Sequence, residues 1–292
     1  MASDKILVLN STGKVGRSTC QALKEVGFDV YGTTRSSNND LASQGIHPVI
    51  CNYTEQADLD RALKETGAKM VLAITDYFGA AKSKAETEIR HGKNAIDAAQ
   101  AAKVDHFIFV SVADAERFND DVKHIKTKVV IEDYLRKSGV PYSILRPTAF
   151  FENFDDPKNW NPLKKGSIKF LTTMSCKYCA TYDIGRAAAI MFKNPKEWLG
   201  RSMDVIGWEG DLSEVAAALE RVGGVPVKAK LAMPIFLRRL LLNDLHNMFL
   251  YFEAGGPKGT PEEFKKIIPD ALSAEDWFRF HGTYSNGEKI SG

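Results

Sequence analysis

The sequence predicts an α/β fold, a doubly wound parallel sheet followed by a smaller C-terminal α+β region. Apolar runs typical of buried strands alternate with segments whose apolar residues recur at spacings of three and four. Six such runs fall within the first 146 residues, which is the pattern of parallel strands joined by helical crossovers. A glycine-containing loop follows the first run, where such sheets bind phosphate groups.

The expected strands are short runs rich in β-branched and aromatic residues. In order they are Lys5–Asn10, Phe28–Thr34, His47–Cys51, Lys69–Thr75, Asp105–Ser111 and Pro141–Arg146, with a seventh, Ser202–Gly207, returning to the same sheet. The expected helices each carry an apolar face. They are Gly13–Gly27, Gln56–Thr66, Ala80–Ala102, Asp121–Ser138, Asp183–Phe192, Leu212–Val222, Arg238–Glu253 and Ser273–His281.

The alternation loosens after Arg146, and this sets the expected domain boundaries. Residues 150–163 contain prolines, acids and bulky aromatic residues and are expected to be irregular. We assign 1–153 to the domain of the parallel sheet, completed by about 183–207. The smaller domain is expected at 154–182 and 208–292, as excursions of the same chain.

Composition excludes several classes of protein. Of 292 residues, 44% are hydrophobic and 26% are charged, which is ordinary globular usage. The formal charge of +2 gives no whole-surface case for binding nucleic acid or an anionic membrane. Four cysteines fit a reducing compartment, and the apolar stretch Ile6–Leu9 is too short for a signal peptide. We expect a cytoplasmic location, and an additional nuclear one stays open.

The loop Asn10-Ser-Thr-Gly13-Lys-Val-Gly16 has the spacing G-x-x-G-x-x-G with Asn in place of the first glycine. Gly13 and Gly16 would allow close approach of backbone N–H groups to a pyrophosphate and close packing of the helix on the strand. Asn tolerates left-handed dihedral angles, so Asn10 can still make the turn. The alternative is a helix start with a purely structural role.

Arg35 indicates which dinucleotide the loop would bind. NAD sites usually carry Asp or Glu at the end of the second strand, but here that strand ends Thr33-Thr34-Arg35. A guanidinium suits a 2′-phosphate, and Lys14 could assist it, so NADP(H) is favoured over NAD. The alternative for Arg35 is a solvated surface arginine.

Several motifs together resemble the NmrA-like family, whose members are atypical relatives of the short-chain dehydrogenases/reductases. The motifs are NSTGKVG, the arginine after the second strand, FVSVAD (Phe109–Asp114), the segment His124–Pro147 and AFFENF (Ala149–Phe154). Two later segments, Asp244–Glu253 and Pro269–His281, resemble the C-terminal region of its NADP(H)-sensing, HSCARG-type branch. The resemblance implies a Rossmann domain that binds NADP(H) and a smaller domain for a substrate or partner.

The resemblance also implies site residues. Asn10 would make the turn, and the pyrophosphate would be met by Thr12, Gly13, Lys14, Val15 and Gly16. Arg35 would meet the 2′-phosphate, while Asn52, where the family has Asp, would lie near the adenine. Thr75 would line the ribose side and Lys128 would hold the nicotinamide ribose. The nicotinamide would be bordered by the segment 147–153, through Pro147, Phe151 and Asn153.

A catalytic site is expected to be incomplete. Short-chain dehydrogenases use Tyr-x-x-x-Lys on a helix, with a Ser at the end of the fifth strand. Here Ser111 and Lys128 occupy two of these places and His124 takes that of the tyrosine. Three interpretations of His124 stay open: a proton donor, a polar cleft residue or a helix-surface histidine. Tyr77 could reach the same place from another side, or pack in the core.

No metal site is expected. Cys176 and Cys179 form one C-x-x-C without a second pair, and two unrelated reduced cysteines are the favoured interpretation. Glu88 and His91 are three residues apart on a helix, which alone does not make a metal site.

The basic stretch Lys123–Lys128 is either a solvated helix face or a phosphate neighbourhood. No base-stacking aromatics accompany it, so direct nucleic-acid binding is not expected. The apolar helix Arg238–Glu253 is expected to be mostly core, and any exposed Leu, Met or Phe there would offer a partner surface.

Three hypotheses of function follow from these residues. The first is an NADP(H)-binding regulatory or redox-sensor protein with weak or no dehydrogenase activity. It would bind a protein partner through the C-terminal domain, and a homodimer is also considered. The second is an NADPH-dependent reductase of quinones or small carbonyl compounds that uses Ser111, His124 and Lys128. The third is a scaffold that binds no cofactor because Asn10 has disabled the loop.

Overall fold

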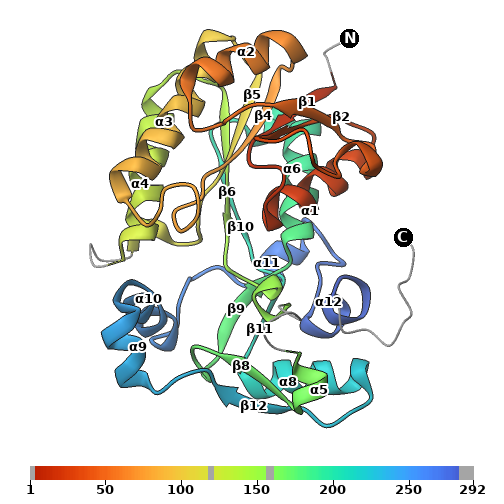
Figure 1. Cartoon of the computed structure of the whole chain (residues 1–292), viewed down its shortest axis with the longest axis vertical. Coiled ribbons are helices and arrows are strands. Elements are labelled where there is room, and N and C mark those ends of the chain that lie inside the picture. The colour runs from red at the N-terminus through yellow and green to blue at the C-terminus, as the bar shows by residue number, and fades with distance from the viewer. Residues whose placement is uncertain (1–3, 118–121, 156–160, 283–292) are drawn as a thin grey trace. The chain divides into compact units, whose positions relative to one another are not determined.

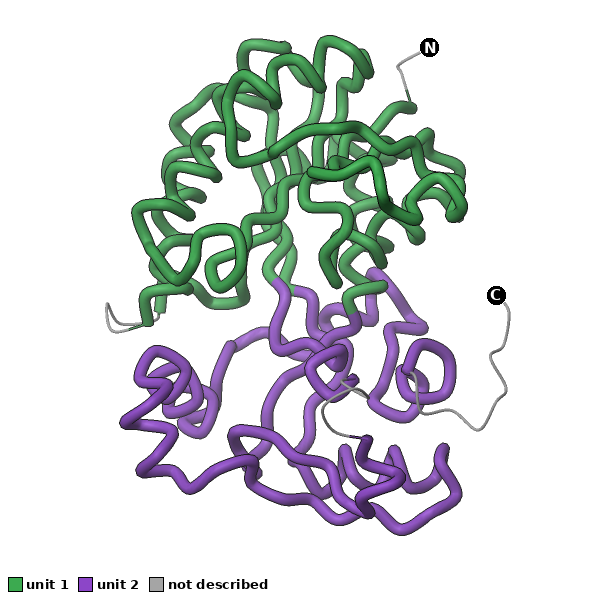
Figure 2. The backbone as a smooth tube through the Cα atoms, viewed as in Figure 1, with its two compact units in different colours: residues 1–146, 181–204 green, residues 147–180, 205–292 purple. Residues whose placement is uncertain are grey.

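The computed structural model describes residues 4–117, 122–155 and 161–282, and the chain divides into two compact units. Unit 1 comprises 1–146 and 181–204, and unit 2 comprises 147–180 and 205–292 (Figure 2). The segment 147–153, assigned to the sheet domain above, falls in unit 2. Within the described ranges, no helix combines the length and the hydropathy needed to span a bilayer.

Unit 1 is built on a seven-stranded sheet, as the sequence predicts. Its strands are β1 (Lys5–Val8), β2 (Asp29–Thr34), β3 (His47–Ile50), β4 (Met70–Ile74), β5 (His106–Val110), β6 (Tyr142–Pro147) and β10 (Ser202–Val205). Their order is β10-β6-β5-β4-β1-β2-β3, and neighbours from β6 to β3 pair in parallel (Figure 1). The connections run outward in opposite directions from β1 and β4, which confirms the doubly wound Rossmann-type fold.

Helices pack on both faces of this sheet (Figure 1). They are α1 (Lys14–Glu25), α2 (Gln56–Thr66), α3 (Ala85–Ala101), α4 (Lys123–Lys137), α6 (Thr181–Lys193) and α7 (Pro195–Trp198), with 3-10 turns η1 (Ala42–Gln44) and η2 (Ala115–Arg117). Helices α1 and α6 pack against each other, as do α2 with α3 and α3 with α4. At the α1–α6 contact, a Cβ on Gly185 would lie 2.8 Å from the Cα of Thr19, so only glycine permits this approach.

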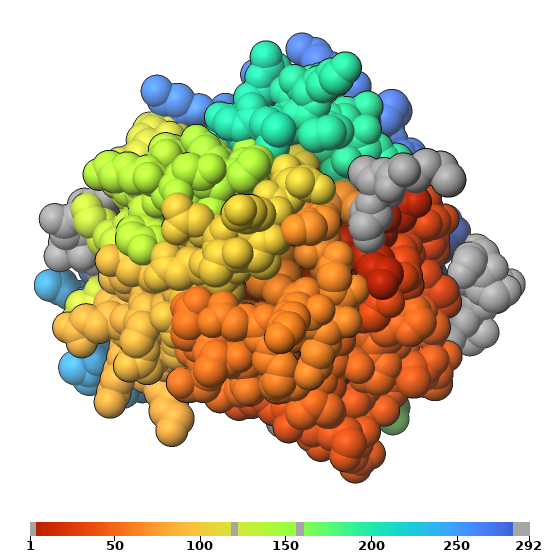
Figure 3. All heavy atoms as spheres, turned by 90° about the horizontal axis from the view of Figure 1, so that it is seen from above, coloured from red at the N-terminus to blue at the C-terminus, as the bar shows by residue number. Residues whose placement is uncertain are grey.

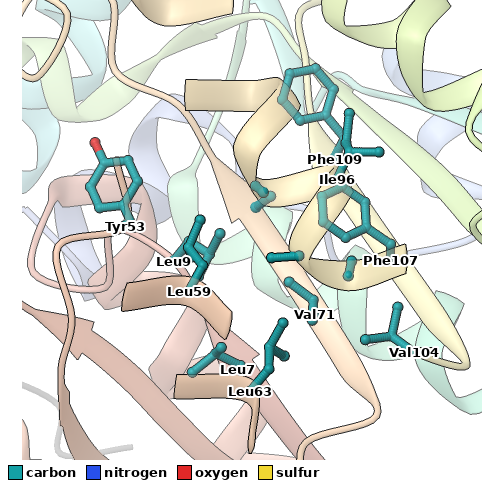
Figure 4. Packing of buried hydrophobic residues seen from close by; sticks show 14 of the residues in the cluster. Leu7, Leu9, Tyr53, Leu59, Leu63, Val71, Ile96, Val104, Phe107 and Phe109 are labelled. Carbon is teal, nitrogen blue, oxygen red and sulfur yellow. The ribbon is translucent and has the colours of Figure 1, made fainter. Parts of the chain in front are cut away.

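One core cluster of unit 1 lies between the sheet and helices α2, α3 and α4 (Figure 4). Leu7, Val71 and Phe107 project from three neighbouring strands, and Leu63 and Ile96 meet them from the helices. All five are at most 4% exposed. Because full burial of such a side chain stabilises by about 1.5–3 kcal/mol, this cluster is a major source of stability for the unit. On the surface, residues of the first segment of unit 1 (1–146), coloured orange and yellow, form much of the face shown in Figure 3.

One helix of unit 1 begins later than its apolar pattern predicts. The expected helix Ala80–Ala102 starts at Ala85, because a turn stabilised by Asp76 precedes it. The Asp76 carboxylate accepts the backbone N–H groups of Gly79 (2.8 Å) and Ala80 (3.2 Å). Lys82 and Ser83 then adopt φ of 51° and 56°, which a right-handed helix does not allow. The predicted first residue of the next helix, Asp121, lies outside the described residues.

Unit 2 contains two small sheets, and the sequence patterns predicted none of their strands. One sheet has the order β11-β9-β7 and the other joins β12 to β8. Their strands are β7 (Ala149–Phe150), β8 (Ser167–Phe170), β9 (Cys176–Cys179), β11 (Trp208–Gly210) and β12 (Lys228–Leu231). The helices are α5 (Pro162–Lys165), α8 (Leu212–Gly223), α9 (Ile235–Leu241), α10 (Asn243–Glu253), α11 (Pro261–Lys265) and α12 (Ala274–Phe280), with the 3-10 turn η3 (Phe151–Phe154). Of the segment expected to be irregular, 156–160 lies outside the described residues.

The single helix expected over Arg238–Glu253 is wrong, because the chain breaks at Leu242 into α9 and α10. Leu242 has φ −132° and ψ 49°, outside the helical region. The break lets α10 fold back on α9, and Arg238 is fully buried between them. Its guanidinium donates to Leu171 O (2.7 Å) and to Glu253 Oε1 (3.1 Å), so the buried charge is compensated.

Cys176 and Cys179 are free thiols on β9 and both are buried. Residues three apart on a strand point to opposite faces of the sheet, so the two thiols do not face each other. Burial raises the pKa of the Cys176 thiol to about 11. Their placement on opposite faces of the strand therefore does not allow a disulfide between them.

Buried His106, at the start of β5, makes the stability of unit 1 depend on pH. Ser143 Oγ donates to Trp198 O (2.8 Å), so Nε2–H of His106 is the donor in the 2.7 Å contact with that hydroxyl. Nδ1 is buried and has no hydrogen-bond partner among the described residues. Burial lowers the pKa of His106 to about 4, because an imidazolium here would be desolvated.

We therefore expect the free energy of unfolding to fall as the pH is lowered from about 6.5 towards 4. The unfolded chain binds a proton in this range while folded His106 does not, and the difference amounts to on the order of 2 kcal/mol by pH 5. Urea denaturation at a series of pH values measures it. His106→Gln should lower stability near pH 7.5 but flatten the pH dependence. An unchanged slope in that variant would contradict the assignment.

Candidate functional site

Polar and cationic residues follow the strands of unit 1 at the carboxyl edge of its sheet. Asn10 follows β1, Arg35 follows β2 and Asn52 follows β3, while Thr75 and Ser111 directly follow β4 and β5. Because parallel strands end at the same edge, these residues gather along one line of the sheet. The neighbours β1 and β4 mark the point where the connections reverse, which is where ligands bind in such sheets.

The loop after β1 has the backbone geometry of a phosphate-binding turn. Asn10 adopts φ 57°, the left-handed conformation expected of the residue that replaces the first glycine. The N–H of Gly13 donates to Asn10 O (3.1 Å) and closes the turn. The loop is fastened to β2 by two bonds to Thr33: Asn10 N–H donates to its Oγ1 (3.0 Å), and the Ser11 hydroxyl donates to its carbonyl (2.8 Å).

The N-terminus of α1 is left open to an anion. Gly13 is the N-cap and provides no side-chain hydrogen bond, and the first turn carries no acidic residue. Gly13 therefore offers no capping side chain to the first-turn N–H groups, and the helix dipole places partial positive charge there. A Cβ on Gly16 would lie 2.2 Å from Asn10 O, so glycine is required for the helix to begin this close to the loop.

Arg35 stands exposed at the end of β2. Within the described ranges, no hydrogen bond or ion pair engages its guanidinium. The loop that follows is tied back to α1 by the Arg17–Asp40 ion pair (2.6 Å), so the loops after β1 and β2 both adjoin the start of α1. An unpaired guanidinium beside an uncapped helix N-terminus is an arrangement suited to two phosphate groups.

The remaining residues expected on the adenine and pyrophosphate side lie along the same edge. Thr12 and Lys14 are exposed, and Val15 is half-buried in the first turn of α1. Asn52 is half-buried, and its Oδ1 accepts the hydroxyl of Thr54 (2.9 Å). This bond holds the turn before α2, so the Asn52 amide already has a structural role that the sequence did not indicate.

The three residues compared with a dehydrogenase site are all in unit 1. Ser111 is buried, and its hydroxyl has no hydrogen-bond partner among the described residues. His124 lies in the first turn of α4, one turn before Lys128, and is half-buried. Its ring packs beside Tyr77 (centroids 6.0 Å apart) and Phe78 (5.3 Å). Tyr77 is buried and packs against His124, whose side chain is half-buried.

Lys128 is held by a residue that sequence reasoning missed. Its ammonium lies 2.6 Å from Glu88 Oε1 and also donates to Thr75 Oγ1, while the Thr75 hydroxyl donates to Glu88 Oε1 (2.8 Å). The sequence raised Glu88 only beside His91 as an insufficient metal pair, and no metal-binding group of three or more ligands occurs among the described residues. The sequence feature that could have identified Glu88 is its position as an acidic residue on the inward face of a predicted helix.

Pro147, Phe151 and Asn153 belong to unit 2. Pro147 and Phe151 are buried and Asn153 is exposed. The Phe151 ring stacks between Tyr178 (5.5 Å between centroids) and Trp277 (5.8 Å), so it is part of the aromatic core of that unit. Their contact with a nicotinamide stays a prediction.

Two surface hollows lie away from this edge. One, of about 490 Å³, is at the amino ends of the strands in unit 1 and is lined by Asp4, Phe28, Met70 and His106 among others. Another, of about 120 Å³, lies in unit 2 beside Cys176, Lys177 and Glu253. Neither includes a residue of the carboxyl edge.

The chain belongs to the NmrA-like family, whose model matches residues 2–275. The photosystem II assembly factor Ycf39 of Trieres chinensis is 26% identical over 271 residues, which cover 90% of this chain and 81% of that protein. Ycf39 of Cyanophora paradoxa is 27% identical over 189 residues, 62% of this chain and 57% of that protein. The (4-alkanoyl-5-oxo-2,5-dihydrofuran-3-yl)methyl phosphate reductase of Streptomyces griseus subsp. griseus is 27% identical over 226 residues, 76% of this chain and 75% of the reductase.

Solved structures share the fold at lower identity. NmrA, a negative transcriptional regulator in complex with NADP, has a TM-score of 0.74 at 19% identity and covers 96% of this chain and 95% of its own. The NADPH-dependent quinone oxidoreductase QOR2 of Escherichia coli, complexed with NADPH, has a TM-score of 0.74 at 20% identity, with 93% and 97% covered. At these identities the likeness establishes the fold alone. The proteins that this chain resembles in sequence or in fold include assembly factors, reductases and a transcriptional regulator.

The turn at Asn10 generates a stability prediction. Asn10→Ala should lower the free energy of unfolding by about 1 kcal/mol, because alanine is strained in the left-handed conformation. Asn10→Gly should stay within about 0.5 kcal/mol of the parent, since glycine adopts this conformation without strain. Urea denaturation measures both, with exposed Asn38→Ala as the matched control that should change little. Equal losses for the alanine and glycine variants would show that the backbone conformation is not what matters.

Proposed function

We propose that this protein binds NADP(H) at the carboxyl edge of the sheet in unit 1 and acts as a regulatory or redox-sensor protein with weak or no dehydrogenase activity. The observation that carries the proposal is the pairing of two anion sites. One is the uncapped start of α1 behind the turn at Asn10, and the other is the unpaired guanidinium of Arg35. A pyrophosphate is common to the dinucleotides, and the 2′-phosphate is the group that distinguishes NADP(H) from NAD(H); two anion sites match these two groups.

The proposal of weak or absent dehydrogenase chemistry rests on His124 and Lys128. An imidazole is shorter than a phenol, and here its ring packs against Tyr77 and Phe78. Lys128, which in the related enzymes assists the acid–base residue, is already paired with Glu88. The HSCARG-type, NADP(H)-sensing branch is the part of the family that this arrangement fits best.

A sensor needs an output, and exposed apolar residues of unit 2 support a protein partner there. Phe236, Leu240 and Leu241 on α9 are 65–76% exposed, and Leu250 on α10 is 48% exposed. We propose that these residues contact a protein partner, for which a second copy of the chain is the first candidate. Sedimentation of the parent and of Leu240→Asp, with and without NADPH, tests for a dimer.

Fluorescent tagging of the full chain tests the proposed cytoplasmic location against a nuclear one.

Calorimetric titration with the four dinucleotides tests the cofactor. NADP⁺ and NADPH should bind more tightly than NAD⁺ and NADH, because only they carry the 2′-phosphate. Arg35→Ala should weaken NADP(H) by roughly 10–100-fold, the loss of about 1.5–3 kcal/mol expected for a charge-assisted contact, and leave NAD(H) within about threefold. Arg221→Ala, which removes a guanidinium from unit 2, is the matched control and should leave all four affinities unchanged.

Two results would overturn this proposal. One is NAD(H) binding as tightly as NADP(H) with no effect of Arg35→Ala. The other concerns sensing, since a ligand shifts a conformational equilibrium only by binding one state better. Equal affinities for NADP⁺ and NADPH, with no change in hydrogen exchange or in partner binding, would remove the sensor role and leave a simple binding protein.

The alternative function is an NADPH-dependent reductase of quinones or small carbonyl compounds. The buried Ser111 hydroxyl supports it, because a hydroxyl without a protein partner is free to bond a substrate oxygen. NADPH oxidation with a panel of quinones and aldehydes measures the activity. If the protein is a reductase, turnover should be detectable and should fall at least tenfold in Ser111→Ala and in Lys128→Ala. Absence of turnover with bound NADPH would favour the sensor.

A further inference from the structure

The most unusual polar group in unit 1 is the carboxylate of Glu88. It sits in the first turn of α3, and its side chain is fully buried. Both of its oxygens are used: Oε1 accepts from Thr75 and Lys128, and Oε2 accepts the hydroxyl of Thr127. These partners come from the end of β4 and from α4, so one carboxylate joins three elements of the unit.

A buried ion pair of this kind needs an explanation. Removing two charges from water is costly, and well-packed apolar residues often stabilise a fold as well or better. The pair is also asymmetric, because the side chain of Lys128 is 13% exposed while that of Glu88 is 0% exposed. The ammonium is thus the end of the pair that a ligand can reach. Of its three N–H donors, two are directed to Glu88 and Thr75.

The geometry points to Glu88 as the positioning residue for the nicotinamide half of the cofactor. We infer that it fixes the ammonium of Lys128 so that the remaining N–H is directed at the nicotinamide ribose hydroxyls. This inference rests on the proposed NADP(H) function. Glu88 acts through Lys128, since a fully buried carboxylate does not touch the ligand. Thr127 orients the carboxylate from the side of α4.

This arrangement predicts that Glu88 contributes to the binding of only one half of the dinucleotide. A lysine side chain has four rotatable bonds, and fixing them when a ligand binds costs conformational entropy. This cost is smaller if the side chain is already held in place before the ligand binds. Glu88 supplies this preorganisation only at Lys128. The adenosine half is met by other residues, namely those of the loop at Asn10 and Arg35. Glu88 should therefore matter for NADPH and not for 2′,5′-ADP, which lacks the nicotinamide mononucleotide.

The test compares the affinities of NADPH and 2′,5′-ADP for the full chain by calorimetry. Glu88→Gln keeps the shape and removes the charge. We expect NADPH to bind at least about tenfold more weakly to this variant, a loss of about 1.4 kcal/mol, with 2′,5′-ADP within about twofold of the parent. Lys128→Met should show the same split, and adding Glu88→Gln to it should cause little further loss, because coupled residues are not additive.

Asp97→Asn is the matched control. Asp97 lies nine residues further along α3 and accepts the Tyr134 hydroxyl of α4 (2.7 Å), so it links the same two helices away from the sheet edge. This variant should leave both affinities unchanged. Thr127→Val is a second variant if Glu88→Gln does not fold, and it should weaken NADPH by about threefold and leave 2′,5′-ADP unchanged.

The outcomes are distinguishable. If the parent protein binds neither NADPH nor 2′,5′-ADP, the proposed NADP(H) function fails and the inference fails with it. If the parent binds both, but folded Glu88→Gln or Thr127→Val changes the two affinities equally or not at all, the inference alone is overturned. Additive losses in the double variant would also overturn it, since Glu88 would then act independently of Lys128.

Discussion

The parallel pairing of the strands in unit 1 is the constraint on which the site depends. Parallel strands all end at one edge, so residues far apart in sequence meet there without any local motif. Asn10, Arg35 and Thr75 share that edge only because β1 lies between β2 and β4. Thr75 lies 65 positions after Asn10 in the sequence. The same constraint leaves the start of α1 facing the edge, where its uncapped N–H groups are available to an anion.

The buried carboxylates of Glu88 and Glu132 in unit 1 are paired with cations, whereas the candidate phosphate-binding arginine is exposed. Glu88 and Lys128 neutralise each other in the interior, and Glu132, which is also buried, pairs with Arg146 (2.6 Å). Arg35 is the contrasting case, an exposed guanidinium that no described residue engages. The net charge of the chain is therefore close to zero because positive and negative side chains cancel in the total, whatever their local pairing. This explains why the net charge of +2 is uninformative about a site that depends on one arginine.

Prediction from sequence succeeded where local pattern and tertiary environment agree. Strands such as Met70–Ile74 are buried along their whole length, and continuous apolar runs identify them. Helix Gln56–Thr66 was expected with the observed bounds, because its apolar face and its glycine stop are both local features. Unit 2 was harder to predict. Its strands β8, β9 and β12 are four residues each, and their pairing partners are distant in sequence. Short strands in small sheets leave no periodicity that a single sequence can reveal.

The sequence by itself determined the class of sheet, the turn at Asn10 and the candidate residues that follow the strands, because each depends on local backbone preference or on runs of apolar residues. Only the tertiary structure decided how those residues are paired. From the sequence, Glu88 is only an acidic residue on a predicted helix; the packing of α3 against α4 places it beside Lys128. Likewise, only the tertiary structure placed Tyr77 and Phe78, from the turn after β4, beside the ring of half-buried His124. Contacts of this kind arise between elements, and no local pattern encodes them.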